Sequence, residues 1–205
     1  MTKDTTTHDV WQGAREEQHR IRLGTIVDMA AELFNRQGYY ATSLSDVADQ
    51  LKITKAALYY YVKNKEDLIY RCALRAVEEL KASLAVAETE GRNGLQKIEI
   101  LFREILEERR GPIVVVSELA SLMPNHKGEI AKHQKELEDA VHRMVREGIA
   151  DGTIADRDPK ILTLWILGTL NWAPKWYPSD SKANAERLSP LFIEVIVNGL
   201  RARKR

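Results

Sequence analysis

Residues 38–68 read GYYATSLSDVADQLKITKAALYYYVKNKEDL, and this stretch decides the fold. Ser43 and Asp46 have the spacing of a capping box, with Asp in place of the usual Glu or Gln, so a short helix is predicted to begin there and to end by Lys52. Thr54 is a second N-cap candidate and predicts another short helix. Two short helices joined by about three residues are what a DNA-reading helix-turn-helix requires.

The second of these helices carries small residues at its N-terminal end. Ala56 and Ala57 would let it approach base edges closely, while hydroxyls and lysines around it can bond phosphates. The chain as a whole has 31 Lys plus Arg and 30 Asp plus Glu, so any charge that favours DNA must be local. Lys52, Lys55, Lys63 and Lys65 fall in a segment, residues 50–65, that has no carboxylate. This basic patch favours nucleic-acid binding, although a chance bias of a solvated surface gives the same pattern.

The same stretch is similar, almost position by position, to the DNA-binding region of the TetR (tetracycline-repressor) family of bacterial transcriptional regulators. Together with the segment AAELF at residues 30–34, the resemblance covers about residues 20–70. It implies a repressor that binds a palindromic operator as a homodimer and is released by a small molecule in its C-terminal domain. Three positions depart from the family pattern: Tyr61 replaces a common His, Val62 a usual Phe and Lys52 a frequent Gly. These departures leave the fold unchanged but bear on the operator sequence.

The resemblance assigns DNA contacts to matching positions. Residues 42–43 would contact phosphate at the start of the first motif helix, where backbone N–H groups also attract anions. Residues 54–57 form the leading turn of the recognition helix, and two tyrosines follow on its exposed side, with packing against the first helix as their alternative. The same alternative applies more strongly to Tyr61. The expected DNA-binding residues are Thr42, Ser43, Thr54, Lys55, Ala56, Ala57, Tyr59, Tyr60 and Lys65.

Nearly the whole chain has apolar residues at three- and four-residue spacing, which predicts an all-α protein. The expected helices span residues 21–36, 44–51, 54–62, 65–90, 95–110, 112–123, 128–151, 159–176 and 190–203. The last two starts follow from Asp-Pro and Ser-Pro pairs, which are typical of an N-cap followed by a first-turn proline. The expected organisation is a flexible N-terminal arm at 1–19, a helix-turn-helix domain at 20–66 and an effector-binding and dimerisation domain at 67–205. The arm is polar and is expected to be mobile or loosely helical.

Trp165, Trp172 and Trp176 are seven and then four residues apart, which places them on one face of a helix. This stripe can belong to the core and dimer interface, or it can form the wall of a ligand pocket. The surrounding segment LGTLNWAPKWY, residues 167–177, is similar to a segment of regulators of fatty-acid and sterol breakdown that respond to acyl-coenzyme A thioesters.

If that shorter resemblance holds, apolar side chains would surround an acyl chain and an arginine would meet the coenzyme A phosphates. The alternative for the arginine is an ordinary solvated side chain. The expected ligand-binding residues are Phe102, Leu106, Arg109, Leu119, Met123, Met144, Trp172 and Trp176. By the family resemblance, the last two helices of each subunit form a four-helix dimer interface. Its expected residues are Trp165, Gly168, Phe192, Val195, Ile196 and Leu200.

Other classes of function find little support in the sequence. The chain has no nucleophile-elbow pattern and no glycine-rich phosphate loop, and His126, His133 and His142 lack the spacing of metal ligands on a helix. We therefore expect no enzyme activity, cofactor or metal. The single Cys72 fits a reducing cytoplasm, and no apolar run approaches the roughly 20 residues needed to span a bilayer.

Two regulator hypotheses remain: a ligand-released repressor, and a DNA-binding protein of the same fold that lacks a small-molecule effector and acts architecturally or through a protein partner. A third, an enzyme built on the helical C-terminal part, is disfavoured by the missing catalytic groups. An apolar cavity between the C-terminal helices would favour the first, whereas a solidly packed bundle would favour the second.

Overall fold

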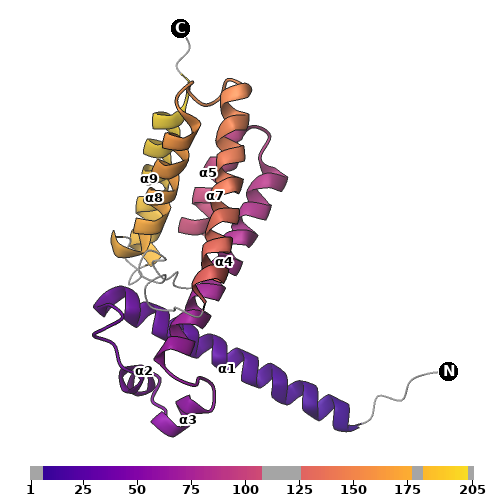
Figure 1. The fold of residues 1–205 in the computed structure, drawn as a ribbon, viewed down its shortest axis with the longest axis vertical. Coiled ribbons are helices and arrows are strands. Elements are labelled where there is room, and N and C mark those ends of the chain that lie inside the picture. Colours follow the sequence, from indigo (N-terminus) through magenta and orange to yellow (C-terminus); the bar gives the residue numbers. More distant parts are fainter. Residues whose placement is uncertain (1–6, 108–125, 177–181, 203–205) are drawn as a thin grey trace, which may run out of the picture. The chain divides into compact units, whose positions relative to one another are not determined.

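The computed structural model describes residues 7–107, 126–176 and 182–202, and the regular structure in these ranges is helical, as predicted (Figure 1). No strand occurs in these ranges, and a single isolated bridge joins Ile154 to Arg201. The predicted helix at 112–123 lies outside the described residues. The helices are α1 (Thr7–Gln37), α2 (Leu44–Gln50), α3 (Lys55–Tyr59), α4 (Lys65–Glu90), α5 (Gly94–Leu106), α7 (Lys127–Ala150), α8 (Pro159–Trp176) and α9 (Lys182–Leu200).

The chain divides into two compact units, Met1–Cys72 and Ala73–Arg205. This division lies inside α4, slightly beyond the boundary at residue 66 that the sequence suggested. The reason is that the first turns of α4 contribute Leu68, Ile69 and Cys72 to the core of the first unit. None of the described helices is both long enough and apolar enough to cross a membrane.

The first unit is built on one buried stripe of α1, which the sequence predicted from Ile26 to Phe34. Gly38, at φ 88°, ends this helix in the left-handed region, and its N–H donates to the Phe34 carbonyl at 2.9 Å. The turn between α2 and α3 uses the same conformation at Lys52, where φ is 55°. The lysine adopts this conformation at a steric cost that a glycine would not have.

Of the expected N-terminal arm at 1–19, residues 7–19 are helical, which is the helical one of the two alternatives, and residues 1–6 lie outside the described residues. The helix begins at Thr7, well before the expected start at Ile21. Hydrophobic periodicity missed this portion because its described side chains are largely exposed and form no apolar stripe. Local pairs support it instead: the Arg20 guanidinium donates to the Glu17 carboxylate at 2.6 Å, one turn away.

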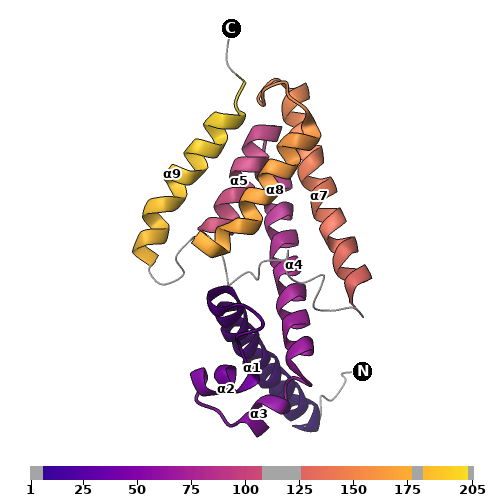
Figure 2. The same cartoon turned by 60° about the vertical axis from the view of Figure 1, so that its left-hand side comes forward.

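In the second unit, α5 packs against α7 and α9, and α7 packs against α8 (Figure 2). The approach of α5 to α7 is unusually close, because a Cβ atom on Gly94 would overlap the Gly148 nitrogen. The end of α9 is fixed to the segment after α7 by two main-chain hydrogen bonds: Ala155 N–H donates to the Leu200 carbonyl at 2.8 Å and Ala202 N–H to the Thr153 carbonyl at 3.1 Å. These two hydrogen bonds tie α9 to the segment that follows α7.

Besides the start of α1 and the end of α5, which lies at Leu106 and was expected at 110, two predicted helix boundaries were wrong. Helix α9 begins at Lys182, not at Pro190, so the proline lies inside the helix and removes one main-chain donor. The Ser-Pro signal misled because Ser189 is buried in the continuing helix and does not cap its start. Helix α3 ends at Tyr59, before Val62, because the N–H groups of Tyr60 and Tyr61 donate to carbonyls three residues earlier.

Candidate DNA-binding and effector sites

The predicted capping box at the start of α2 is confirmed. The Asp46 N–H donates to Ser43 Oγ at 3.1 Å, and the Ser43 N–H donates to Asp46 Oδ2 at 2.6 Å. The hydrogen bond from the Ser43 backbone lowers the pKa of Asp46 below its usual value. At α3, the Ala57 N–H donates to Thr54 Oγ1 at 3.1 Å, so Thr54 is the predicted N-cap. These caps set where the two motif helices begin.

One side of α3 is free of intramolecular packing. Leu58 is fully buried and anchors the helix, while the side chains at 54–57 are exposed. The side chains of Tyr59 and Tyr60 are 49% and 74% exposed. Neighbouring aromatic side chains with this much exposure are unusual on the surface of a monomeric protein. The arrangement presents small, hydroxyl and basic groups on one helix, the chemistry that reads base edges and phosphates.

Thr42 does not fit its expected phosphate contact. The residue is 1% exposed, and its hydroxyl donates to the Gly38 carbonyl at 2.9 Å. Its hydroxyl therefore stabilises the turn after α1. In the sequence, a threonine next to a capping residue looks the same whether it contacts phosphate or stabilises a turn. Only its burial in the structure distinguishes the two roles.

Lys65, the other expected phosphate contact, is half-buried. Its Nζ lies 4.2 Å from the centre of the Tyr39 ring, a distance typical of a cation–π contact. Partial burial lowers the pKa of Lys65, and the nearby Asp46 carboxylate acts in the opposite direction. Lys52, Lys55 and Lys63, by contrast, are exposed.

His19 was not identified from the sequence but lies beside the end of α3. Its ring centre is 4.9 Å from that of Tyr61 and 5.7 Å from that of Tyr60. The half-buried Tyr61 thus packs against α1, the alternative considered for it, while Tyr60 remains mostly exposed. His19 is a single histidine in a polar segment, so no pattern in the sequence indicates that it packs against the tyrosines.

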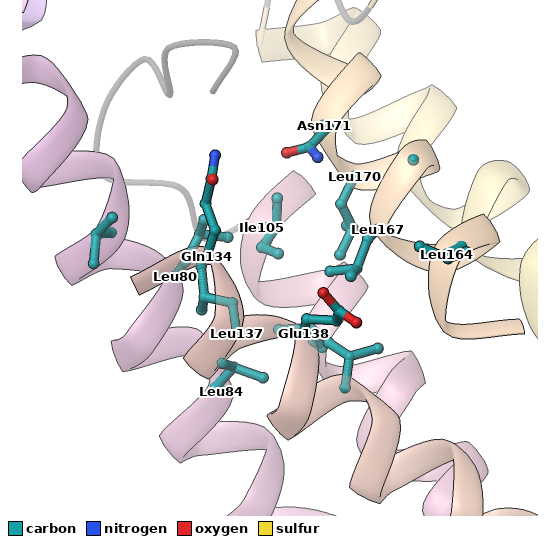
Figure 3. A pocket seen from close by; sticks show the side chains of 14 residues that line it. Leu80, Leu84, Ile105, Gln134, Leu137, Glu138, Leu164, Leu167, Leu170 and Asn171 are labelled. Atoms are coloured by element: carbon teal, nitrogen blue, oxygen red, sulfur yellow. The ribbon is translucent and has the colours of Figure 1, made fainter. Parts of the chain in front are cut away.

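The second unit contains a cavity of about 380 Å³, within the size range of small-molecule sites (Figure 3). Its wall is mostly aliphatic and comes from four helices. The lining residues are Val77, Leu80 and Leu84 of α4, Leu101 and Ile105 of α5, Gln134, Leu137, Glu138 and Val141 of α7, and Leu164, Leu167, Gly168, Leu170 and Asn171 of α8.

Three of the predicted ligand-binding residues have described side chains, and these three are not among the residues that line the cavity. Phe102, Leu106 and Met144 are buried in the core between the helices, where they pack against neighbouring side chains. Helical periodicity identifies a buried face but does not tell which of its residues border an empty space. Arg109, Leu119 and Met123 lie outside the described residues, as do the side chains of Trp172 and Trp176.

Two polar residues of the cavity wall could have been recognised from the sequence. Ile130, Gln134, Leu137 and Val141 follow one face of α7, so Gln134 interrupts an apolar stripe. Asn171 likewise follows Leu167 and Leu170 on α8. A polar residue on an otherwise apolar face needs a partner or a solvated cavity, and such a break in the stripe could have identified both residues.

The predicted dimer residues divide into two groups. Ile196 and Leu200 are buried in the core of their own subunit, and Phe192 packs edge-on against Phe102 with ring centres 6.4 Å apart. The first two therefore do not fit an interface. Trp165, Gly168 and Val195 are exposed, as are three apolar residues that were not predicted: Ile161 and Leu164 of α8 and Leu191 of α9.

These exposed residues form two apolar faces. One face of α8 carries Ile161, Leu164, Trp165 and Gly168 at helical spacing. Two of these, Leu164 and Gly168, also line the cavity. Leu191 and Val195 are one turn apart on α9. We call these the α8 face and the α9 face. Large side chains exposed in such groups on a monomer are typical of an interaction surface.

Within the described ranges no group of three or more His, Cys, Asp or Glu residues is placed to hold a metal ion.

Comparison with known proteins identifies both units. Residues 26–72 match the family described as "Bacterial regulatory proteins, tetR family", and residues 96–200 match "Tetracyclin repressor-like, C-terminal domain". The chain is 23% identical to the HTH-type transcriptional repressor KstR2 of Mycolicibacterium smegmatis, over 89% of this chain and 92% of that protein.

Two further matches extend over most of the chain. It is 23% identical to the fatty acid metabolism regulator protein of Bacillus subtilis, over 90% of this chain and 98% of that protein. The fold matches a crystal structure of AibR in complex with isovaleryl coenzyme A and operator DNA, with a TM-score of 0.69 and 22% identity over 85% of this chain and 97% of that one.

Proposed function

Because the chain belongs to the TetR family of bacterial transcriptional regulators, we propose that it is a dimeric repressor that an apolar acyl-coenzyme A thioester releases from a palindromic operator. The cavity in the second unit is the observation that carries this proposal. A solidly packed bundle would have favoured a regulator without an effector. The B. subtilis relative acts in fatty acid metabolism, and the AibR structure holds an acyl-coenzyme A, which supports this class of ligand.

For the DNA contacts, we propose the exposed residues of the motif. Ser43 and the residues from Thr54 to Ala57 lie at the starts of α2 and α3, and the N-terminus of a helix attracts a phosphate. Lys55 adds a positive charge, and Tyr59 and Tyr60 extend from the same helix. Lys65, although half-buried, contributes charge beside Tyr39. Thr42 would support DNA binding indirectly, by stabilising the turn after α1, and would not contact a phosphate itself.

Lys55→Ala is expected to weaken binding to every DNA sequence and to lower the slope of log affinity against log salt by roughly one unit, since one fewer counterion is released. Fluorescence anisotropy with labelled operator, from low to moderate salt, measures this slope. The matched control is Lys132→Ala, which removes an exposed lysine of α7. An unchanged slope for Lys55→Ala, or an equal drop for Lys132→Ala, would place Lys55 outside the interface.

Acyl-coenzyme A thioesters are expected to release the operator. A ligand that prefers the DNA-free conformation lowers DNA affinity by its differential binding, and DNA must lower ligand affinity by the same factor. Anisotropy titrations of the operator complex, with straight-chain and sterol-derived thioesters, measure the first factor. Calorimetry with and without operator measures the second. If no thioester in the panel changes operator affinity, the effector proposal fails while the family membership stands.

A variant that fills the cavity tests whether the thioester acts from this site. Leu137→Trp places an indole in the cavity and should abolish release by the thioester while ligand-free operator binding stays nearly unchanged. Ala131→Trp, at an exposed position of α7 that does not line the cavity, is the control and should respond normally. Thermal unfolding shows whether both variants fold.

A further inference from the structure

The wall of the cavity carries one acidic side chain and, among the described lining residues, no lysine, arginine or histidine. We propose that the cavity accepts uncharged apolar groups and rejects carboxylates, and that Glu138 sets this selectivity. The inference deepens the proposed function, on which it rests, because it separates an activated acyl thioester from the corresponding free acid. A regulator built this way responds to the esterified form of the acid alone.

The position of Glu138 supports this role. It lies on α7 one turn after Gln134, and both residues line the cavity. Figure 3 shows its carboxylate beside Leu167, toward the interior of the lining side chains. The side chain is 39% exposed, so it keeps part of its hydration and remains at the border between cavity and solvent.

The charge of Glu138 is only partly offset. Lys135 Nζ lies 3.4 Å from Glu138 Oε1 but 3.0 Å from Asp139 Oδ1, so two carboxylates share one ammonium group. The hydrogen bond to Asp139 is the main cause that raises the pKa of Lys135. Lys135 is itself exposed and is not among the residues that line the cavity. A negative field therefore remains at the cavity wall.

The other described polar side chains of the wall are neutral. Gln134 and Asn171 each present a carboxamide, and Figure 3 shows the two near the same end of the cavity. A carboxamide N–H can donate to the carbonyl oxygen of a thioester or ester. Neither group can neutralise a carboxylate, so an acid that enters would find no cationic partner among the described lining residues.

The expected size of the effect follows from Coulomb's law. Two like charges a few ångströms apart repel by an amount that depends on the dielectric, and at a half-exposed site this corresponds to about 10- to 100-fold in affinity. Loss of hydration adds to the discrimination, because a carboxylate in an apolar cavity is unfavourable even without repulsion. Removal of the Glu138 charge should therefore restore part of the affinity for an acid, not all of it.

The experiment compares three probes that share one alkyl chain and differ in charge: the N-acetylcysteamine thioester of decanoic acid, decanoate and decyltrimethylammonium. Each displaces the neutral dye Nile red from the full-length protein without DNA at neutral pH. The wild type should bind the thioester at least about 10-fold more tightly than decanoate. Glu138→Gln should raise the affinity for decanoate about 10-fold and lower the affinity for the cation. Its affinity for the thioester should stay within about twofold of the wild-type value.

Asp139→Asn is the matched control, because Asp139 also pairs with Lys135 but does not line the cavity. It should leave all three affinities nearly unchanged. Leu137→Trp should weaken all three and so place the probes in this cavity. Equal binding of decanoate and thioester by the wild type, no displacement by the thioester, or a uniform shift of all three probes in Glu138→Gln would overturn the proposal. These readouts need no operator, so they are independent of whether thioesters release DNA.

Discussion

Val195→Asp is expected to convert the protein into monomers that still fold. Val195 is 69% exposed on the α9 face, so the new carboxylate is hydrated in an isolated subunit. In a symmetric dimer through the α8 and α9 faces, each variant chain would bury one unpaired charge, which costs several kcal/mol per ion. The equilibrium therefore moves toward monomers, and sedimentation velocity measures the change.

Operator binding should fall with the dimer. A palindromic site is bound by two recognition helices held at a fixed spacing, and loss of the link between them removes about 10²-fold or more in affinity. Anisotropy with the full operator measures this loss, while a half-site should bind wild type and variant with similar weak affinity. Ile161→Asp on the α8 face is expected to have the same effect.

Two controls distinguish an interface from a core. Ala131→Asp adds the same charge at an exposed position of α7 outside both faces and should leave the dimer intact. Ile196→Asp, in contrast, should unfold the subunit, because Ile196 is 1% exposed in its own core. If Val195→Asp and Ile161→Asp both remain dimeric and bind the operator normally, the interface lies elsewhere on the molecule.

Gly94→Ala is expected to destabilise the second unit by about 2–3 kcal/mol, a large effect for one methyl group. The added Cβ would overlap the Gly148 nitrogen and the Met144 carbonyl oxygen. Both atoms belong to the backbone of α7, so no side-chain rotation relieves the clash. The two helices must separate or the chain must bend.

The same change should also reduce effector binding, because α5 and α7 both line the cavity. The shift would move Leu101 and Ile105 relative to Leu137 and Val141, and it would disturb the hydrogen bond from the Gly94 N–H to Asp151 Oδ2 at 3.0 Å. Urea unfolding followed by circular dichroism, at one fixed protein concentration, measures the stability.

Gly128→Ala is the control, since nothing lies within 4 Å of the position that a Cβ atom would take there, and its effect should stay within about 0.5 kcal/mol. An equally stable Gly94→Ala protein with unchanged thioester affinity would show that the close approach of α5 and α7 is not required.

The sequence by itself determined the features that depend on neighbouring residues. The capping box at Ser43, the N-cap at Thr54 and the span of α4 from Lys65 to Glu90 were predicted correctly. Each follows from hydrogen bonds or periodicity within a few residues, which the order of amino acids encodes directly. The resemblance to the family rests on the same kind of local pattern, over about residues 20–70, and the matches over residues 26–72 and 96–200 bear it out.

Only the tertiary structure decided which apolar residues face a neighbour, a cavity or solvent. Met144 and Leu137 are both apolar residues of α7, yet one is buried in the core and the other lines the cavity. Val195 and Ile196 are adjacent on α9, yet one is exposed and the other buried. Helical spacing determines on which side of its helix each residue lies. What the residue meets on that side depends on helices that are distant in the sequence. The packing of α4, α5, α7 and α8 therefore set the cavity wall, and with it the place of Glu138.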